Sequence, residues 1–309
     1  MLIDSGQFLG NIENIQHLFR RSFNREIERR YIVWRYVDNP LKHTLVSVNY
    51  DNGNVTANYS ACPCYLSYKS ITMKSALSMT TMTDPDYRGK GIFPLLAREL
   101  YDFICQNGYK MVWGFPNHFS HAKFITSLNW SNIYEIPTMV LNLSSYTFKG
   151  TIQYETDNTF DMSYDDSIIR DDLIHVLKSQ IYLKWRYAQN PVNKYYNIVI
   201  LEHEKVSSYL VFKYYGQCLD IVDFQVVNYD EAEYLLQAVI GIANDHKLSY
   251  INCWAPVHHF IHPLCEKYGF RSSTPITYFG GRILDEQLDQ KDYLNYSNWY
   301  IQMGDSDVY

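Results

Sequence analysis

Two glycines with one residue between them, Gly89 and Gly91, lie in a polar segment that joins a run of extended residues to a helix. Glycine allows the backbone to approach a ligand closely, and the first N–H groups of a helix point at whatever lies in front of it. Pro94 stands at the expected first helical position, where its missing N–H costs nothing. The combination suits a bound phosphate, although a plain connection between a strand and a helix would use the same residues.

The elements that must position this loop predict a mixed α/β fold. Residues 76–82 predict a strand before the loop, and residues 94–107 predict an amphipathic helix after it. Residues 111–115 predict a short buried strand, and residues 120–128 predict a further helix after the break at Pro116-Asn117.

Two elements are expected upstream of the loop. Residues 11–30 predict a helix, because apolar residues recur at steps of three and four. Residues 45–50 and 55–60 predict a β-hairpin, since the Asn52-Gly53 pair between them is a strong turn signal.

The second half of the chain repeats the first. Residues 182–191 match residues 31–40 at a shift of 151 positions, and six of the ten residues are identical. Chance is a poor explanation for this match, so we expect two copies of one fold. Trp34-Arg35-Tyr36 recurs in it as Trp185-Arg186-Tyr187, which favours a structural role for these residues over substrate contact.

The two copies differ at the glycine loop. Farther along the chain the shift is about 140 positions, and residues 228–233 then stand under residues 88–93 with three carboxylates and no glycine. A loop required only by the fold would keep its glycines in both copies, so their loss favours a ligand role in the first. We expect residues 1–150 to bind the ligand and residues 151–309 to form a copy that is degenerate at this loop.

Bulk composition narrows the possible partners. The 309 residues carry a formal net charge of -6 and show no basic stripe, which argues against a nucleic-acid or anionic-membrane partner. The chain has no run of about 20 apolar residues that would predict a membrane span, and its first residues do not resemble a secretory signal. The six cysteines lack zinc-ligand spacing, so we expect a cytoplasmic protein with reduced thiols and no metal.

The first half of the chain resembles the core of the GNAT superfamily of acyl-CoA-dependent N-acyltransferases. The resemblance lies in the order of a strand, the Arg88–Phe93 loop, a helix, a strand, Pro116-Asn117, a helix and Asn129-Trp130. Residues 82–93, followed by 114–117, are similar to two-lobed members of cell-surface polysaccharide pathways such as O-antigen and lipopolysaccharide biosynthesis. Some of these enzymes acylate nucleotide-linked deoxyamino sugars.

This resemblance implies tandem GNAT-type lobes, with acyl-CoA in the first and the second covering the acceptor. The expected acyl group is acetyl or a longer hydroxyacyl chain, and the expected acceptor is the amine of a nucleotide-linked amino sugar. Two alternatives stay open. In the first alternative, the acceptor is a peptide or protein amine, or another small amine. In the second alternative, the chain is a non-catalytic CoA-binding module.

The resemblance also implies which residues hold the cofactor. Backbone N–H groups of the loop would bind the CoA pyrophosphate, and the main chain of the preceding strand would align the pantetheine arm. The residues expected to bind the cofactor are Met82, Thr83, Arg88, Gly89, Lys90, Gly91, Ile92, Phe93, Asn117 and Ser120. Two positions depart from the family pattern: Phe93 replaces a small residue, and Ile125 stands where a tyrosine usually protonates the thiolate.

For catalysis we expect positioning, an oxyanion donor and a proton route. The backbone N–H of Met82 is the candidate donor, because the strand is expected to bulge there. His118 is the candidate proton relay, against the alternative of an exposed histidine at a helix start. Asp305 and Asp307 are candidate substrate ligands, against the alternative of a solvated terminus.

Simpler roles compete for four other residues. Asn117 and Ser120 would also serve as caps of the following helix, and Asp84 before a proline is typical of a turn. Lys90 would pair with a CoA phosphate or lie in solvent.

Overall fold

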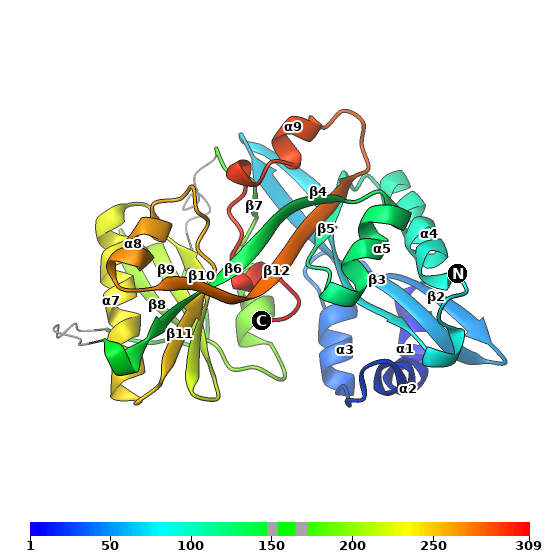
Figure 1. Cartoon of the computed structure of the whole chain (residues 1–309), viewed down its shortest axis with the longest axis horizontal. Helices are drawn as coiled ribbons and strands as arrows, with labels where there is room; N and C mark the ends of the chain where they lie inside the picture. The colour runs from blue at the N-terminus through cyan, green and yellow to red at the C-terminus, as the bar shows by residue number, and fades with distance from the viewer. Residues whose placement is uncertain (147–153, 165–171) are drawn as a thin grey trace. The chain divides into compact units, whose positions relative to one another are not determined.

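Helices and strands follow one another in the same order twice along the chain (Figure 1). The computed structural model describes residues 1–146, 154–164 and 172–309. The chain forms two compact units. The first unit is Met1–Leu66, Thr72–Tyr134 and Tyr278–Leu294, and the second unit is Ser67–Ile71, Glu135–Thr277 and Asn295–Tyr309.

The first unit begins with helices and continues into a hairpin-rich sheet. Its elements are β1 (Leu2–Ile3), α1 (Ser5–Gly10), α2 (Ile12–Phe23), α3 (Arg29–Tyr36), β2 (Leu45–Asp51), β3 (Asn54–Tyr68), β4 (Ile71–Thr83), α4 (Ile92–Gln106), β5 (Met111–Gly114) and α5 (His118–Leu128). Its strands lie in the order β1-β2-β3-β4-β5, and β12 (Arg271–Ile283) pairs with β5. The β4–β5 pair is parallel, whereas β1–β2, β2–β3 and β5–β12 are antiparallel.

The second unit repeats the later part of this order, three strands, a helix, a strand and a helix. Its elements are β6 (Ser131–Asn142, which begins in the first unit), β7 (His175–Val176), α6 (Gln180–Leu183), β8 (Tyr196–Glu202), β9 (Lys205–Tyr215), β10 (Cys218–Gln225), α7 (Tyr229–Asp245), β11 (Tyr250–Cys253) and α8 (Ile261–Lys267). The strand order is β6-β11-β10-β9-β8, with a parallel β10–β11 pair that corresponds to β4–β5. The predicted α/β fold with a mixed sheet is therefore confirmed, and part of the element order occurs in both units.

Each unit has its own apolar core. In the first unit, Leu96, Leu100 and Ile104 lie on one face of α4 and pack with strand residues such as Val112. In the second, the buried face of α7 packs in the same way against β9, β10 and β11. The spacing of apolar residues in α4 therefore identifies these three core residues, whereas Phe103, which the same spacing predicts to be buried, is 37% exposed.

The helix predicted over residues 11–30 is wrong in extent. Asn24 adopts a left-handed conformation (φ 54°) and its N–H donates to the carbonyl of Arg20, which ends α2 at Phe23. The next helix, α3, begins at Arg29. The hairpin is confirmed, since Asn52 and Gly53 both have positive φ between β2 and β3.

Helix α4 begins two residues earlier than predicted. Ile92 is its first residue, so Pro94 is the third, still within the turn whose N–H groups have no partner inside the helix. The predicted boundary between residues 150 and 151 lies outside the described residues. The assignment of residues 1–150 and 151–309 to two functional lobes stays a prediction. Neither compact unit is one continuous stretch of chain, since the first unit also includes Tyr278–Leu294.

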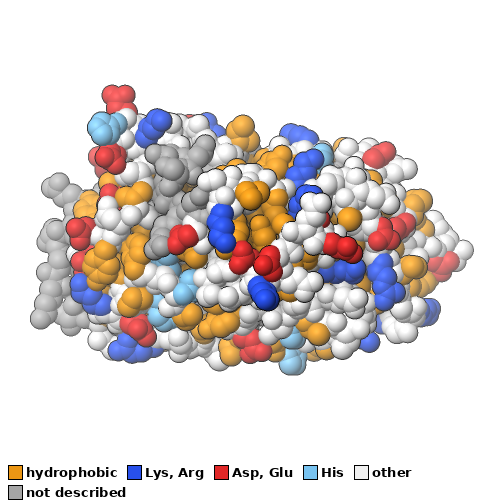
Figure 2. All heavy atoms as spheres, turned by 90° about the horizontal axis from the view of Figure 1, so that it is seen from above, with side chains coloured by type: hydrophobic (Ala, Val, Ile, Leu, Met, Phe, Trp, Pro, Cys, Tyr) orange, Lys and Arg blue, Asp and Glu red, His pale blue; other side chains and the backbone are white. Residues whose placement is uncertain are grey.

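No helix among the described residues is apolar over a length that would cross a membrane. Figure 2 shows acidic and basic side chains interspersed on one face of the molecule.

Candidate functional site

The glycine loop ends at an open helix N-terminus. Gly89 and Gly91 have φ of +77° and +74°, a region that side chains other than glycine rarely adopt. Gly91 is the N-cap of α4, and within the described chain no side chain caps this helix. A Cβ atom built on either glycine would meet nothing within 4 Å, so space for a ligand lies next to the backbone. An exposed helix N-terminus with this geometry fits a phosphate group.

In the second unit, the N-terminus of the corresponding helix, α7, is capped by a side chain next to it. The Oδ1 of Asn228 accepts the backbone N–H of Glu231 at 2.9 Å. Asp230 and Glu231 place two negative charges in the first turn of α7. These charges complement the helix dipole and would repel a phosphate. The contrast predicted from the repeat is thus also present in the geometry of the two helix ends.

Strands β4 and β5 part just before the loop. Their parallel pairs run from Ser75–Met111 to Ser78–Gly114, where the strands approach so closely that a Cβ on Gly114 would lie 3.0 Å from the carbonyl of Ser78. Two residues further, Thr80 has φ of +45° within β4, and its carbonyl accepts a hydrogen bond from the Asn58 side chain at 3.0 Å. The strand is therefore distorted at Thr80, two residues before the expected bulge.

Met82 and Thr83 lie at the end of β4, beyond this distortion. Met82 is buried and Thr83 is half-buried. Their roles in aligning a pantetheine arm and, for Met82, in donating to an oxyanion stay predictions.

The capping role of Asn117 is confirmed, whereas the Ser120 hydroxyl accepts no backbone N–H from this fully described helix and instead supports the cap. The Oδ1 of Asn117 accepts the backbone N–H groups of Phe119 and Ser120, each at 3.0 Å, and the Ser120 hydroxyl donates to the same oxygen at 3.1 Å. Contact with the cofactor stays a prediction for both residues. His118 is the first residue of α5 and is exposed, with its ring centroid 6.5 Å from that of Tyr278.

Basic side chains of the loop are exposed and engaged locally. The Nζ of Lys90 lies 4.5 Å from the centroid of the Tyr87 ring. The Nε of Arg88 donates to the carbonyl of Thr83 at 3.2 Å, which ties the loop to the end of β4. Binding of a phosphate by either side chain stays a prediction.

Phe93 is part of an aromatic cluster behind the loop. Its half-buried ring packs against Tyr59 and Phe124, with centroid distances of 5.9 and 5.3 Å. Ile125 packs, also half-buried, against the same core. Both departures from the family pattern therefore extend the apolar core toward the loop.

A buried phenol lies where β4 and β5 part, and the sequence pattern does not indicate it. The Tyr59 hydroxyl donates to the Ser78 hydroxyl at 2.8 Å and also contacts the Tyr101 hydroxyl at 2.8 Å. Burial raises the pKa of Tyr59 above its usual value, so this phenol is protonated at neutral pH.

Asp84 forms the predicted turn and has a partner that the sequence does not reveal. Its Oδ1 accepts the N–H of Asp86 at 3.0 Å, as in a turn. Its two carboxylate oxygens accept hydrogen bonds from the Nε and Nη2 of Arg21, both at 2.9 Å. These hydrogen bonds lower the pKa of Asp84 to about 2. Sixty-three positions separate the two residues, so no local pattern could have identified the pair.

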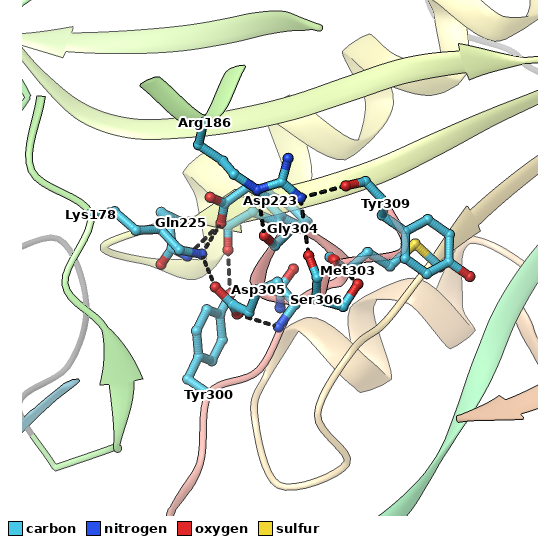
Figure 3. Close-up of polar contacts among 12 residues, drawn as sticks. Lys178, Arg186, Asp223, Gln225, Tyr300, Met303, Gly304, Asp305, Ser306 and Tyr309 are labelled. Atoms are coloured by element: carbon cyan, nitrogen blue, oxygen red, sulfur yellow. Dashed lines mark hydrogen bonds and ion pairs between the residues drawn. The ribbon is translucent and has the colours of Figure 1, made fainter. Parts of the chain in front are cut away.

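The C-terminal segment is buried in the second unit (Figure 3). Asp305 is 2% exposed, accepts the N–H of Gln302 at 2.8 Å, and lies 2.9 Å from the Nζ of Lys178. Arg186 donates to the carbonyls of Gly304 and Ser306 at 3.1 and 3.2 Å. The alternative of a solvated terminus is therefore wrong for Asp305, and the structural role predicted for Arg186 is observed.

Substrate binding by Asp305 and Asp307 stays a prediction. A substrate that binds Asp305 must compete with Lys178 for the carboxylate. Asp307 is half-exposed, so part of its side chain is accessible to solvent. No group of three or more potential metal-ligating side chains occurs within the part of the chain that the structure describes.

The arrangement of strands, open loop and helix defines an acyltransferase-type fold, and comparisons with known proteins agree. Residues 9–133 match the family model described as acetyltransferase (GNAT) domain, so this part of the chain is a GNAT domain. GNAT domains use acyl-CoA, and the class of protein is an acyl-CoA-dependent N-acyltransferase. No curated protein sequence matches the chain.

Solved structures with the same fold share little sequence with this chain. A probable N-acyltransferase from Enterococcus faecalis V583 is 13% identical, with a TM-score of 0.68 over 90% of this chain and 71% of its own. A GCN5-related N-acetyltransferase from Anabaena variabilis ATCC 29413 is 12% identical, with a TM-score of 0.65 over 89% of this chain and 71% of its own. A further one, from Kribbella flavida, is 12% identical, with a TM-score of 0.65 over 90% and 70%. At sequence identities of 12–13%, the structural similarity to these proteins establishes the fold of both units and nothing more.

Proposed function

We propose that this protein transfers an acyl group from acyl-CoA to the amine of a nucleotide-linked deoxyamino sugar. The observation that carries the cofactor assignment is the uncapped N-terminus of α4 with two left-handed glycines before it. The acceptor assignment is supported by the sequence resemblance over residues 82–93 and 114–117. Acetyl is the expected acyl group, a longer hydroxyacyl group is the alternative, and the cytoplasm is the expected compartment.

In this proposal the residues of the chain position the reactants and exclude water. Backbone N–H groups from Arg88 to Phe93 hold the pyrophosphate, and the end of β4 aligns the pantetheine arm beside the distortion at Thr80. The neutral amine attacks the thioester carbonyl directly, and the N–H of Met82 stabilises the oxyanion. The C–N bond forms, the C–S bond breaks, and the proton that the amine loses passes to the departing thiolate.

A strong general base is not needed for such an acceptor. A sugar amine titrates at about 8, by analogy with an α-amino group, so a useful fraction is already neutral near pH 7. No Asp or Glu occurs from Ser75 to Thr83, along the part of β4 that would face the amine. His118 is the proposed proton relay, and the second unit, with Asp305 and Asp307, is proposed to cover the acceptor.

The experiment follows thiol release from acetyl-CoA in the presence of nucleotide-linked amino sugars. Parallel reactions contain a lysine-bearing peptide, spermidine or no acceptor, and a second series uses 3-hydroxybutyryl-CoA. We expect acceptor-dependent thiol release with an amino sugar, and a product whose mass has increased by the acyl group. Release only with the peptide or spermidine would overturn the acceptor assignment.

A second candidate function is a CoA-binding module without turnover. Ile125 favours it, because an apolar side chain packs where the family's tyrosine would donate a proton. Titration calorimetry with CoA separates the two candidates. CoA binding without thiol release from any acyl-CoA would support the module, whereas absence of CoA binding would refute both.

A further inference from the structure

Two carboxylates precede the proposed phosphate loop. Asp84 is the N-cap and Asp86 the second residue of a 3-10 turn, Pro85–Tyr87, and Arg88 joins this turn to Gly89. Three residues span at most about 11 Å, so Asp86 lies within roughly one Debye length of the loop. Uncompensated negative charges at this distance repel a pyrophosphate, because a bound polyanion and a carboxylate have the same sign.

Arg21, from the last turn of α2, contacts both carboxylates. Its Nε and Nη2 donate to the two oxygens of Asp84, and its Nη2 lies 2.7 Å from an oxygen of Asp86. Such a two-pronged contact fixes geometry as well as charge. Asp84 in turn donates its backbone N–H to the carbonyl of Thr56 at 2.9 Å, so the turn is tied to β3 as well.

The acids occur only in the copy that has the loop. In the second copy, the residues before α7 are Phe224, Gln225, Val226 and Val227, and none of them is charged. The second copy has Phe224 and Val226 at the positions of Asp84 and Asp86, so this acidic turn belongs to the copy with the glycine loop. A cation that offsets the two carboxylates lowers the repulsion that a pyrophosphate in the loop would meet.

We propose that Arg21 is a positioning residue of the phosphate loop, which holds the turn before Gly89 and offsets the charges of Asp84 and Asp86. This inference rests on the proposed function, since it concerns the binding of CoA to that loop. Arg21 itself does not contact the reacting atoms. Its effect acts through the shape and potential of the loop.

The test measures CoA affinity of the full chain by titration calorimetry. We expect Arg21→Met to raise the Kd for CoA about tenfold, since it removes charge-assisted contacts and leaves two unpaired acids. The matched control is Arg20→Met, because Arg20 lies in the same helical turn and pairs with the exposed Glu26 at 3.2 Å. This control should leave the Kd within about twofold of the native value.

If Arg21 acts by offsetting the charges of Asp84 and Asp86, two further results are expected. The triple variant Arg21→Met, Asp84→Asn, Asp86→Asn should recover most of the affinity, and the loss in Arg21→Met should shrink in 0.5 M salt. A purely structural role of Arg21 would predict neither result. Melting temperatures accompany each titration, and Arg21→Gln, which also removes the charge but keeps a hydrogen-bond donor, replaces Arg21→Met if that variant does not fold.

The outcomes separate this inference from the proposed function. Native protein that binds no CoA would refute both. Native binding with equal Kd values for the Arg21 and Arg20 variants would overturn the inference alone. A triple variant as weak as Arg21→Met would refute the charge role.

Discussion

The Nζ of Lys178 lies 2.8 Å from the Oδ1 of Asp223, and both side chains are buried in the second unit (Figure 3). Asp305, from the C-terminal segment, is a second carboxylate at 2.9 Å from the same nitrogen. Asp223 also accepts hydrogen bonds from Gln225 at 2.7 Å and Tyr187 at 2.9 Å. One buried cation thus joins β10 to the C-terminal segment.

We expect Lys178→Met to lower the free energy of unfolding by about 3–5 kcal/mol, because it leaves buried carboxylates without a counter-charge. The measurement is equilibrium unfolding in urea. Lys184→Met is the control, since Lys184 pairs with Asp161 at 2.6 Å where the Asp161 side chain is 69% exposed, and it should cost less than about 1 kcal/mol. Equal costs for the two variants would contradict the assignment of a buried ion pair.

Local signals account for the parts of the site that the sequence predicts. The hairpin at Asn52-Gly53, the left-handed glycines of the loop and the Asn117 cap each depend on a few adjacent residues. The internal repeat then supplies the contrast between Gly91 and Glu231, because a loop required only by the fold would keep its glycines in both copies. Turn and cap chemistry is encoded locally, so one sequence is sufficient to find it.

Distant pairs account for the parts that the sequence does not predict. Arg21 and Asp84 belong to a helix and a turn far apart in the chain, and their contact depends on how α2 packs. Burial of Asp305 depends on Lys178 in the same way, since an acid near a terminus is ordinarily solvated. The end of α2 at Phe23 cannot be read from apolar spacing alone, because that spacing continues past the C-cap Asn24.

The stability contributed by Asp84 should depend on pH. Its folded pKa, about 2, is below the ordinary value of 3.8, so this contribution is fully present above about pH 4 and is lost as the pH falls toward 2. We expect Asp84→Asn to be less stable than the native chain at pH 6, and the difference to narrow between pH 4 and 2. Thermal unfolding at several pH values measures this, with Asp102→Asn as a surface control. A difference independent of pH would refute the assigned ionisation.

Asn117 allows capping and cofactor contact to be separated. Asn117→Ala removes the acceptor of two backbone N–H groups and should cost about 1 kcal/mol of stability. Asn117→Ser keeps an acceptor oxygen and adds no charge, so it should restore stability, yet it loses the amide N–H that would bind a pantetheine carbonyl. If the residue only caps α5, Asn117→Ser will bind CoA with native affinity. A weaker affinity at native stability would establish a cofactor contact.

Gly91→Glu transfers to the first unit the residue type that stands at Glu231 in the second. We expect it to abolish CoA binding in calorimetry, because its carboxylate competes with phosphate for the N-terminus of α4. The fold should persist, since a Cβ at Gly91 meets nothing within 4 Å and the cost of a left-handed side chain is about 1–2 kcal/mol. Gly91→Ala bears the same backbone cost without the charge, so the difference in Kd between the two variants isolates electrostatic exclusion. Native affinity in both variants would mean that phosphate does not bind at this helix end, and the cofactor assignment would then lose its main support.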